Sequence, residues 1–253
     1  MKQLVSIIIL NKNNFELLSN CVNSILKNST YNNYKIIIAD TGSDSEVLNN
    51  IKKLCASNKI KLIVYDSYHF EKINNDIVKN HIDKKTKYVL FCNNDIQFLT
   101  DCISEMVDTF ESNSDVGTVG AVLYYGDESI QHKGIFCKIE NSQLRIGHNC
   151  LGHKEGIKTQ PDTAVLGNTA ALQLVSVDVL EHLNYFPETY IDSLSDVEFN
   201  LSCVKNGYKN ILCGKALAFH FESQTRKSGG KIILDDFNTL TKFIEQNEIR
   251  SIL

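Results

Sequence analysis

The sequence lacks the features that mark several large classes of protein. No window is long and apolar enough to span a membrane, and the longest apolar run near the start covers only residues 4–10. That run is also too short for a signal peptide, and no small-residue cleavage site follows it. Lys and Arg number 26 against 30 Asp and Glu, so the net charge of -4 gives no electrostatic reason to expect nucleic acid as a partner. These absences predict a cytoplasmic chain that binds no nucleic acid.

Three common short motifs are missing as well. None of the eight cysteines forms C-x-x-C, and several fall inside apolar segments, which predicts free buried thiols in a reducing compartment. Residues 148–153 hold two His and one Cys, but without an obvious fourth ligand we expect a polar loop rather than a zinc site. No P-loop occurs, and no G-x-G-x-x-G follows the first strand. A nucleotide bound here would therefore need another partner for its phosphates, and bridging Mn²⁺ or Mg²⁺ is the common alternative.

The 253 residues, 43% of them hydrophobic, suffice for one large α/β domain. Short apolar runs typical of buried strands alternate with apolar residues at helical spacing. Strands are expected at 4–10, 34–39, 60–65 and 88–92, and helices at 18–26, 47–55 and 73–82. Such alternation predicts a mostly parallel central sheet with helices on both faces.

The second half of the sequence has a less regular pattern. We expect strands at 116–123 and 216–221 and a loop region at 138–162. We also expect a short helix capped by Ser176 and a further helix capped by Ser195 or Asp196. An amphipathic helix follows Ser228-Gly229-Gly230. Packing on the sheet is its default role, while peripheral membrane contact or a homodimer contact stays open.

Polar side chains stand where predicted strands end. Asp40 and Asp95 each follow a buried strand at its carboxyl end, the edge at which open α/β sheets bind ligands. Each candidate also has a structural interpretation. Asp40 could cap a helix or form an Asx-turn, Asp196 could be only a helix N-cap, and His220 could be a hydrogen-bonded core histidine.

Six runs together resemble one enzyme family. They are Val5-Ser6-Ile7-Ile8-Ile9, the stretch Ile36 to Asp44, Asn93-Asn94-Asp95, Ile130-Gln131-His132-Lys133-Gly134, Asp196-Val197-Glu198-Phe199 and the stretch His220 to Arg226. Their order and spacing resemble family 2 glycosyltransferases of GT-A fold, and most closely the bacterial rhamnosyltransferase-like members that build surface polysaccharides. The resemblance covers roughly residues 4–226. It implies a single GT-A domain at 1–227, with a nucleotide-binding half at 1–112 and an acceptor half at 113–227, followed by a C-terminal helix at 228–253.

The resemblance also implies roles for individual residues. Asp196 would be the general base, and Asp95 and His220 would bind Mn²⁺ or Mg²⁺. The donor nucleotide would contact Ile9, Asn11, Asn13, Asp40, Gly42, Ser43, Asn75, Asn93, Asn94 and Arg226. The acceptor or the sugar would contact His132, Gly167, Asn168 and Glu198.

The sequence departs from the family pattern at three places. Asn93-Asn94-Asp95 replaces Asp-x-Asp, which implies weaker metal binding. Ser195 stands where an acidic residue usually precedes the base. Asn11-Lys12-Asn13 replaces a Pro-Thr-Tyr-Asn-like turn, which leaves the contacts to the nucleotide base open.

The implied reaction transfers a sugar, with inversion, from a UDP- or dTDP-linked donor to a glycan or lipid-linked glycan acceptor. Two rivals remain. One is a nucleotide-sugar-binding module without transfer activity. The other is a nucleotidyltransferase, although residues 11–15 lack the glycine-rich basic loop that this class needs.

Overall fold

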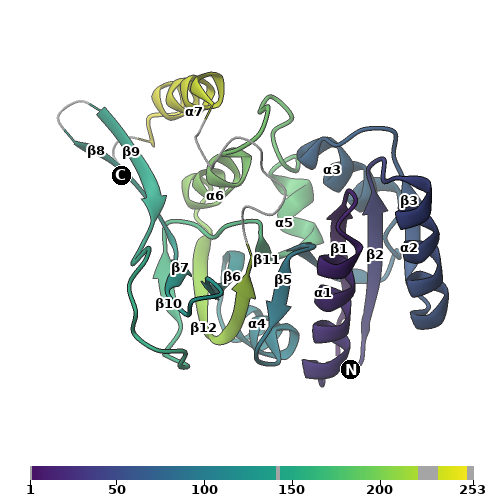
Figure 1. The fold of residues 1–253 in the computed structure, drawn as a ribbon. Helices are drawn as coiled ribbons and strands as arrows, with labels where there is room; N and C mark the ends of the chain where they lie inside the picture. Colours follow the sequence, from purple (N-terminus) through teal and green to yellow (C-terminus); the bar gives the residue numbers. More distant parts are fainter. Residues whose placement is uncertain (1, 141–142, 222–232, 250–253) are drawn as a thin grey trace.

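The computed structural model describes residues 2–140, 143–221 and 233–249. Its first half alternates strands and helices in the predicted order (Figure 1). The elements are β1 (Leu4–Asn11), α1 (Phe15–Asn28), β2 (Tyr34–Asp40), α2 (Ser45–Asn58), β3 (Lys61–Val64), α3 (Phe70–Asn80), β4 (Thr86–Asn93), β5 (Ile96–Phe98) and α4 (Cys102–Glu111).

The second half adds antiparallel strands and three more helices. The elements are β6 (Val116–Tyr124), β7 (Ile130–His132), β8 (Ile135–Glu140), β9 (Gln143–His148), β10 (Thr163–Val165), β11 (Leu172–Ser176), α5 (Val177–His182), α6 (Ser195–Lys205), β12 (Lys209–His220) and α7 (Leu234–Gln246).

One sheet joins both halves, in the strand order β10-β12-β6-β11-β4-β1-β2-β3. The neighbours β4, β1, β2 and β3 are all parallel, as are β6 and β12, whereas β11 runs antiparallel between β4 and β6. The predicted mostly parallel sheet is therefore confirmed, with antiparallel insertions in the second half.

Helices cover both faces of this sheet, as predicted. In β1, Ile7 and Ile9 belong to one buried cluster together with residues of α1, α2 and α4. Ile8, between them, belongs to a second cluster with residues of α3, α5 and α6. Because successive side chains of a strand point to opposite faces, each apolar run is buried from both sides.

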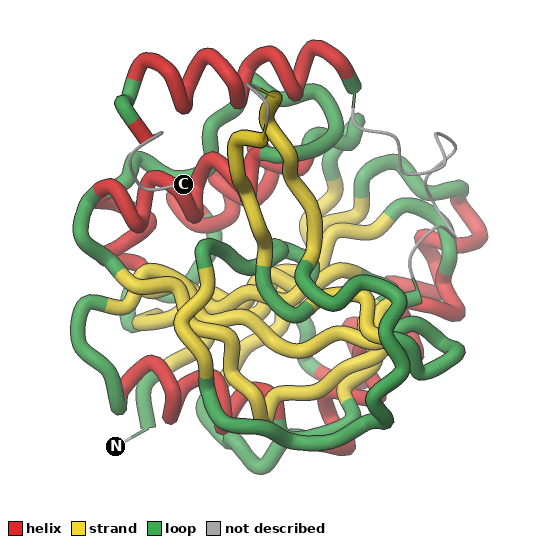
Figure 2. The backbone as a smooth tube through the Cα atoms, turned by 90° about the vertical axis from the view of Figure 1, so that its left-hand side faces the viewer, coloured by secondary structure: helices red, strands yellow, loops and turns green. Residues whose placement is uncertain are grey.

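The expected loop at 138–162 is wrong in its first part. Residues of this stretch form a two-stranded antiparallel hairpin, β8–β9, which projects from the main sheet toward α7 (Figures 1 and 2). Leu144 and Ile146 pack inward while Gln143 and Arg145 are exposed. This alternation is the period-two signal of a half-buried strand, and it was hidden among polar residues and glycine.

The helix starts were predicted with mixed success. The Ser176 hydroxyl accepts a hydrogen bond from Val179 N–H and caps α5, as expected. At α6, by contrast, neither Ser195 nor Asp196 is the cap. Leu194 holds that position in a left-handed conformation, with φ 72°, and no side chain caps the helix. Asp196 therefore lies inside the first turn, which frees its carboxylate from a capping role.

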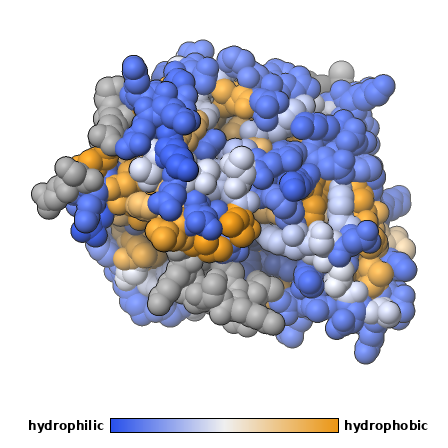
Figure 3. Space-filling model, turned by 90° about the horizontal axis from the view of Figure 1, so that it is seen from above, coloured by the Kyte–Doolittle hydropathy of each residue, from blue (hydrophilic) through white to orange (hydrophobic). Residues whose placement is uncertain are grey.

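The C-terminal helix packs on α6 and the hairpin rather than on the sheet. Leu240 and Ile244 of α7 join Tyr190, Leu194 and Leu201 in a third buried cluster. Most of the outward residues of α7 are polar, and the face seen from above is largely hydrophilic (Figure 3). The apolar side of this helix is thus covered within the molecule.

A close backbone contact fixes the centre of the sheet. A Cβ added at Gly120 in β6 would lie 2.3 Å from Asn168 Oδ1. Asn168 cannot move away easily, because its side-chain amide donates to Thr118 Oγ1 at 2.9 Å and to the Ile211 carbonyl at 3.1 Å. Position 120 therefore has no room for a side chain, and only glycine fits there.

We expect Gly120→Ala to lower the free energy of unfolding by about 1–3 kcal/mol, since the methyl group overpacks a bonded, buried amide. Urea denaturation monitored by circular dichroism measures the change. Gly126→Ala is the matched control, because its added Cβ would meet only Phe221 at an ordinary 3.4 Å. Equal stabilities of the two variants would contradict the steric argument.

Candidate functional site

Strand register places polar residues side by side at one edge of the sheet. Asn11 at the end of β1 pairs with Asp40 at the end of β2, and Leu10 pairs with Asn93 at the end of β4. These three strands are parallel neighbours, so their carboxyl ends meet at the same edge. We call this row and the residues packed against it the polar edge, which comprises Asp40, Asn11, Asn93, Asn94, Asp95, His220 and Asp196.

Asp40 is fully buried, and its two carboxylate oxygens differ. Oδ1 accepts a hydrogen bond from the Ser43 amide at 2.9 Å, so the Asx-turn interpretation is correct for this atom. Oδ2 is also buried but has no hydrogen-bond partner among the described residues. Gly42 between them has φ 95°, which a glycine adopts without strain. The turn thus leaves one carboxylate oxygen available to a ligand.

Asparagines connect Asp40 with the end of β4. The Asn11 amide donates to the Asn13 carbonyl at 2.8 Å and accepts from Asn94 Nδ2 at 2.7 Å. The Asn13 N–H in turn donates to Ser43 Oγ at 2.7 Å. These hydrogen bonds hold the turn after β1 against the turn after β2. The primary role of the side chains involved is therefore structural; they are Asn11, Asn13, Asn94 and Ser43.

Asp95 and His220 face each other although they are 125 positions apart. Pairing of β5 with β12 sets Ile96 against His220, and His220 Nε2 lies 3.2 Å from Asp95 Oδ1. Both side chains are buried, yet Asp95 Oδ1 makes no hydrogen bond within the described residues, because proximity alone does not meet the angular requirement. Asn93 Nδ2 lies 3.3 Å from the same His220 nitrogen.

Gln131 orients the imidazole, a role the sequence analysis did not assign. His220 Nδ1 lies 2.8 Å from Gln131 Oε1, which accepts a hydrogen bond from Nδ1–H, so the imidazole is held with its Nε2 on the side of Asp95. A carboxylate oxygen without a partner and an imidazole fixed through its other nitrogen are a donor set that fits Mn²⁺. Mg²⁺ prefers oxygen ligands and fits less well.

Asp196 reaches this edge from α6. Its Oδ2 accepts a hydrogen bond from Ala170 N–H at 3.1 Å, and its Oδ1 accepts from Val197 N–H at 2.9 Å. The carbonyl of Ala171, the next residue in the chain, accepts from the Asn93 backbone N–H, so the segment that holds Asp196 is bonded to the end of β4. The side chain is half-buried and can be reached from solvent.

A second carboxylate near Asp196 was not predicted. Glu71 lies at the start of α3 and is 3% exposed, and its Oε2 is 3.1 Å from His69 Nδ1. Burial raises the pKa of Glu71, and the nearby Asp196 carboxylate adds to the increase. No sequence motif marks Glu71, because its importance comes only from a contact between distant segments.

Several predicted contact residues lie inside the protein. Ile9 is a core residue of β1. Asn75 is hydrogen-bonded to Phe186 and Glu188, so its amide ties α3 to that loop. Gly167 and Asn168 pack and bond against Asn200. These four residues have structural roles, and their predicted contacts with donor or acceptor stay predictions.

The side chains of His132 and Glu198 are also hydrogen-bonded to other residues of the protein. Arg226 lies outside the described residues. His132 Nε2 accepts from the amides of Gly134 and Thr169, and burial first, then His148 and His220, keep the pKa of His132 well below its usual value. Glu198 accepts from the Tyr190 hydroxyl at 2.6 Å, and burial raises its pKa. The neutral His132 thus supports the backbone near Gln131.

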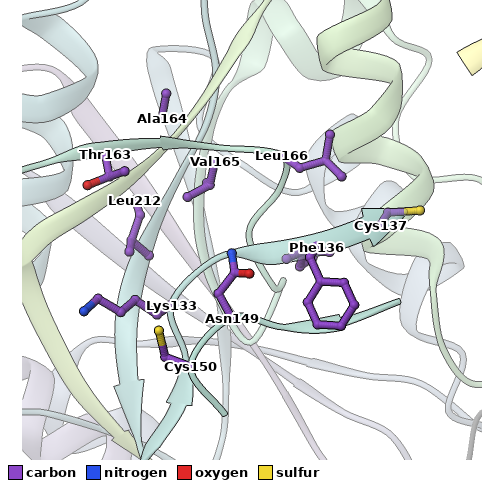
Figure 4. Close-up of a pocket in the computed structure, with 11 residues that line it drawn as sticks. Lys133, Phe136, Cys137, Asn149, Cys150, Thr163, Ala164, Val165, Leu166 and Leu212 are labelled. Atoms are coloured by element: carbon purple, nitrogen blue, oxygen red, sulfur yellow. The ribbon is translucent and has the colours of Figure 1, made fainter. Parts of the chain in front are cut away.

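A separate cavity of about 480 Å³ lies between the hairpin, β10 and β12 (Figure 4). Val165 and Leu212 line it on the sheet side, and Lys133 and Asn149 line it on the other. None of the polar-edge side chains borders this cavity.

The cysteines behave as predicted: all eight are free and seven are buried. The exception, Cys150, lies in a turn in which its Sγ and ligand atoms of His153 and Glu155 are within 4.8 Å of one another. Glu155 already pairs there with Lys133 at 3.2 Å.

Comparison with known proteins agrees with the observed fold. A curated relative, the uncharacterized protein y4gI of Sinorhizobium fredii, is 28% identical over 232 residues, which cover 88% of this chain and 25% of that protein. The crystal structure of GalNAc-T7 with UDP, GalNAc and Mn²⁺ matches with a TM-score of 0.73 and 12% identity, covering 97% of this chain and 49% of that one. The mannosyltransferase PcManGT from Pyrobaculum calidifontis, in complex with GDP-Man and Mn²⁺, matches with a TM-score of 0.63 and 13% identity, covering 89% and 58%.

The chain therefore spans about a quarter of the curated relative and about half of each solved structure. At these identities the solved structures show a shared GT-A fold and no more. The model of glycosyl transferase family 2 matches residues 6–181, well over half of the sequence. On this evidence the chain belongs to glycosyl transferase family 2.

Proposed function

We propose that this protein is an inverting glycosyltransferase that moves a sugar from a UDP- or dTDP-linked donor to a hydroxyl of a glycan acceptor. One observation carries the proposal: Asp40 and Asp95 follow the parallel strands β2 and β4 at one edge of the sheet, His220 Nε2 lies 3.2 Å from Asp95 Oδ1, and Asp196 accepts from Ala170 N–H beside the same edge. Family membership supports the reaction class. The UDP, GalNAc and Mn²⁺ in one solved neighbour and the GDP-Man and Mn²⁺ in the other support a nucleotide-linked sugar as donor.

The nucleotide end of the donor would lie over β1 and β2. Asp40 Oδ2 is a buried acceptor without a partner, and it would accept the N3–H of uracil or thymine. Asn11 and Asn13 would hold the turn beneath the base, and Asn93 or Asn94 would contact the ribose. Arg226 would cover the diphosphate.

Asp95 and His220 would hold Mn²⁺ or Mg²⁺, and a bound metal would neutralise charge on the leaving diphosphate. Gln131 keeps His220 Nε2 turned toward Asp95, so the protein presents an oxygen and a nitrogen ligand without rearrangement. Asn93, in place of the first acidic residue of Asp-x-Asp, would make metal binding depend on the donor phosphates.

Asp196 would be the general base. The acceptor oxygen forms a bond to the anomeric carbon, the bond from that carbon to the diphosphate oxygen breaks with its electron pair, and the acceptor proton passes to the Asp196 carboxylate. The backbone amides of Ala170 and Val197 donate hydrogen bonds to the two carboxylate oxygens and fix the direction of the side chain. Attack on the face opposite the leaving group inverts the anomeric centre.

We further propose a bacterial surface polysaccharide or lipooligosaccharide precursor as product, formed in the cytoplasm or at the inner face of the membrane. Within the described residues, no helix is both long and apolar enough to cross a bilayer. A lipid-linked acceptor would require only peripheral contact with the membrane. A homodimer is compatible with the same reaction.

A nucleotide-sugar-binding module without transfer activity is the second candidate. It is favoured by the amides at Asn93 and Asn94 and by Ser195 before the base. Titration calorimetry with UDP and dTDP, combined with a hydrolysis screen over UDP-, dTDP- and GDP-sugars, separates the two. Binding without turnover of any donor would favour the module.

We expect Asp196→Asn to retain metal-dependent binding of UDP or dTDP while kcat falls by about 10²- to 10⁴-fold, since an amide cannot take the proton. Calorimetry and a transfer assay measure the two effects. Asp178→Asn, on the exposed start of α5, is the control and should leave both unchanged. Wild-type turnover by Asp196→Asn would remove this residue from the role of base.

We also expect EDTA to abolish transfer and Mn²⁺ to restore it. Asp95→Asn and His220→Ala should weaken Mn²⁺ binding in the presence of UDP, as measured by electron paramagnetic resonance, because each loses a ligand. His182→Ala, an exposed histidine at the end of α5, should bind Mn²⁺ like the wild type. Unchanged rates in EDTA would eliminate the metal role of both residues.

A further inference from the structure

Asp236 in the first turn of α7 is a buried carboxylate that accepts hydrogen bonds from three backbone amides and, at 3.5 Å, from the Ser193 hydroxyl. It is 1% exposed. Its Oδ1 accepts a hydrogen bond from Ile191 N–H at 2.8 Å, and its Oδ2 accepts from Asp192 N–H at 3.0 Å and Ser193 N–H at 2.9 Å. Three successive backbone donors aimed at one carboxylate form an anion-binding nest, which offsets the cost of burying the charge.

The segment bonded to Asp236 leads directly into α6, the helix that carries the proposed base Asp196. Ser193 is followed by Leu194, which begins α6 in a left-handed conformation, and Asp196 lies two residues further on. No side chain caps this end of α6. The direction of its first turn therefore depends on the preceding loop, and that loop is fixed by the three bonds to Asp236.

Apolar contacts at both ends of the same loop, and a hydrogen bond from the Tyr190 hydroxyl, add to the bonds that Asp236 makes. Tyr190, 1% exposed, packs in one cluster with Leu240 and Ile244 of α7, and its hydroxyl donates to Glu198 Oε2 on α6. The cluster includes Leu194 and Val197 on either side of Asp196. The terminal helix, the loop and the first turn of α6 thus form one packed unit.

We propose that Asp236 is a positioning residue for the general base: α7 sets the place of Asp196 through the loop of residues 190–194. This inference rests on the proposed role of Asp196. It assigns the C-terminal helix a part in catalysis, although the helix lies outside residues 6–181, where the family model matches.

The substitution Asp236→Asn tests the proposal, because the asparagine side chain has nearly the same volume as the aspartate side chain. A carboxylate accepts through two oxygens, whereas an amide has one oxygen and places an NH₂ group against at least one of the three N–H donors. We expect faster hydrogen exchange at the amides of residues 191–193, an unchanged melting profile of the sheet and unchanged UDP binding. Because misplacement of a catalytic group by about 1 Å can cost 10²-fold, kcat should fall about 10- to 100-fold while KM for the donor stays the same.

Asp235→Asn is the matched control, since Asp235 is the exposed neighbour on the same helix turn. It should leave exchange and kcat at wild-type values. Asp236→Asn with faster exchange but full kcat would overturn the positioning role, and so would a loss of kcat with unchanged exchange. Failure of the proposed function is distinguishable, because the wild-type protein would then turn over no donor, whereas failure of the base assignment alone would leave Asp196→Asn fully active.

A measurement on the wild-type protein covers the case in which Asp236→Asn does not fold. The amides of residues 191–193 lie outside any helix or strand, yet the proposal requires them to exchange slowly, at a rate shared with α7. Exchange of these amides at the rate of an open loop would contradict it without any substitution.

Discussion

Burying a carboxylate oxygen without a hydrogen-bond partner costs free energy, and the polar edge of this sheet does so twice. Asp40 Oδ2 and Asp95 Oδ1 are both buried and make no hydrogen bond within the described residues. A stable fold tolerates such groups where a ligand completes them. The N–H of a nucleobase would suit the first, and a divalent cation the second. The need for external partners at these two atoms is what ties the rest of the site to its proposed chemistry.

Asparagine, glutamine and backbone amides hold these acids in place without neutralising them. Asn11 and Asn94 connect the ends of β1 and β4, and Gln131 bonds His220 through the nitrogen that faces away from Asp95. A lysine or arginine in these positions would compete with a metal for the carboxylate. Neutral amides fix geometry and leave the negative charge available, which suits a site that must attract a cation and release a diphosphate.

Strand and helix alternation in the first half could be predicted because each apolar run is buried from both faces and each helix carries one apolar stripe. The ends of β2 and β4 then identified Asp40 and Asp95.

The hairpin β8–β9 could not be found in the same way, since its alternation is short and interrupted by polar residues. Glu71, Gln131 and Asp236 could not be found either. Each is an ordinary polar residue until the fold brings a distant segment against it. Asn75 and Asn168 show the converse: their side chains make hydrogen bonds that stabilise the fold, which no sequence motif indicated.

The position of the proposed general base raises a different physical question from that of the proposed nucleotide site. Asp40 and Asp95 follow strands whose register is set by many ladder hydrogen bonds, so their places are determined by the sheet itself. Asp196 stands on a helix that begins without a side-chain cap after a loop, and a loop has few internal constraints. A base must nonetheless be held within a fraction of an ångström of its productive position. In the proposed arrangement, the buried Asp236 carboxylate, which accepts from three loop amides, would supply that constraint from a separate helix. A separate helix can be altered without disturbing the sheet, so the two halves of the proposed site, one built on strands and one held by α7, would be able to change independently of each other.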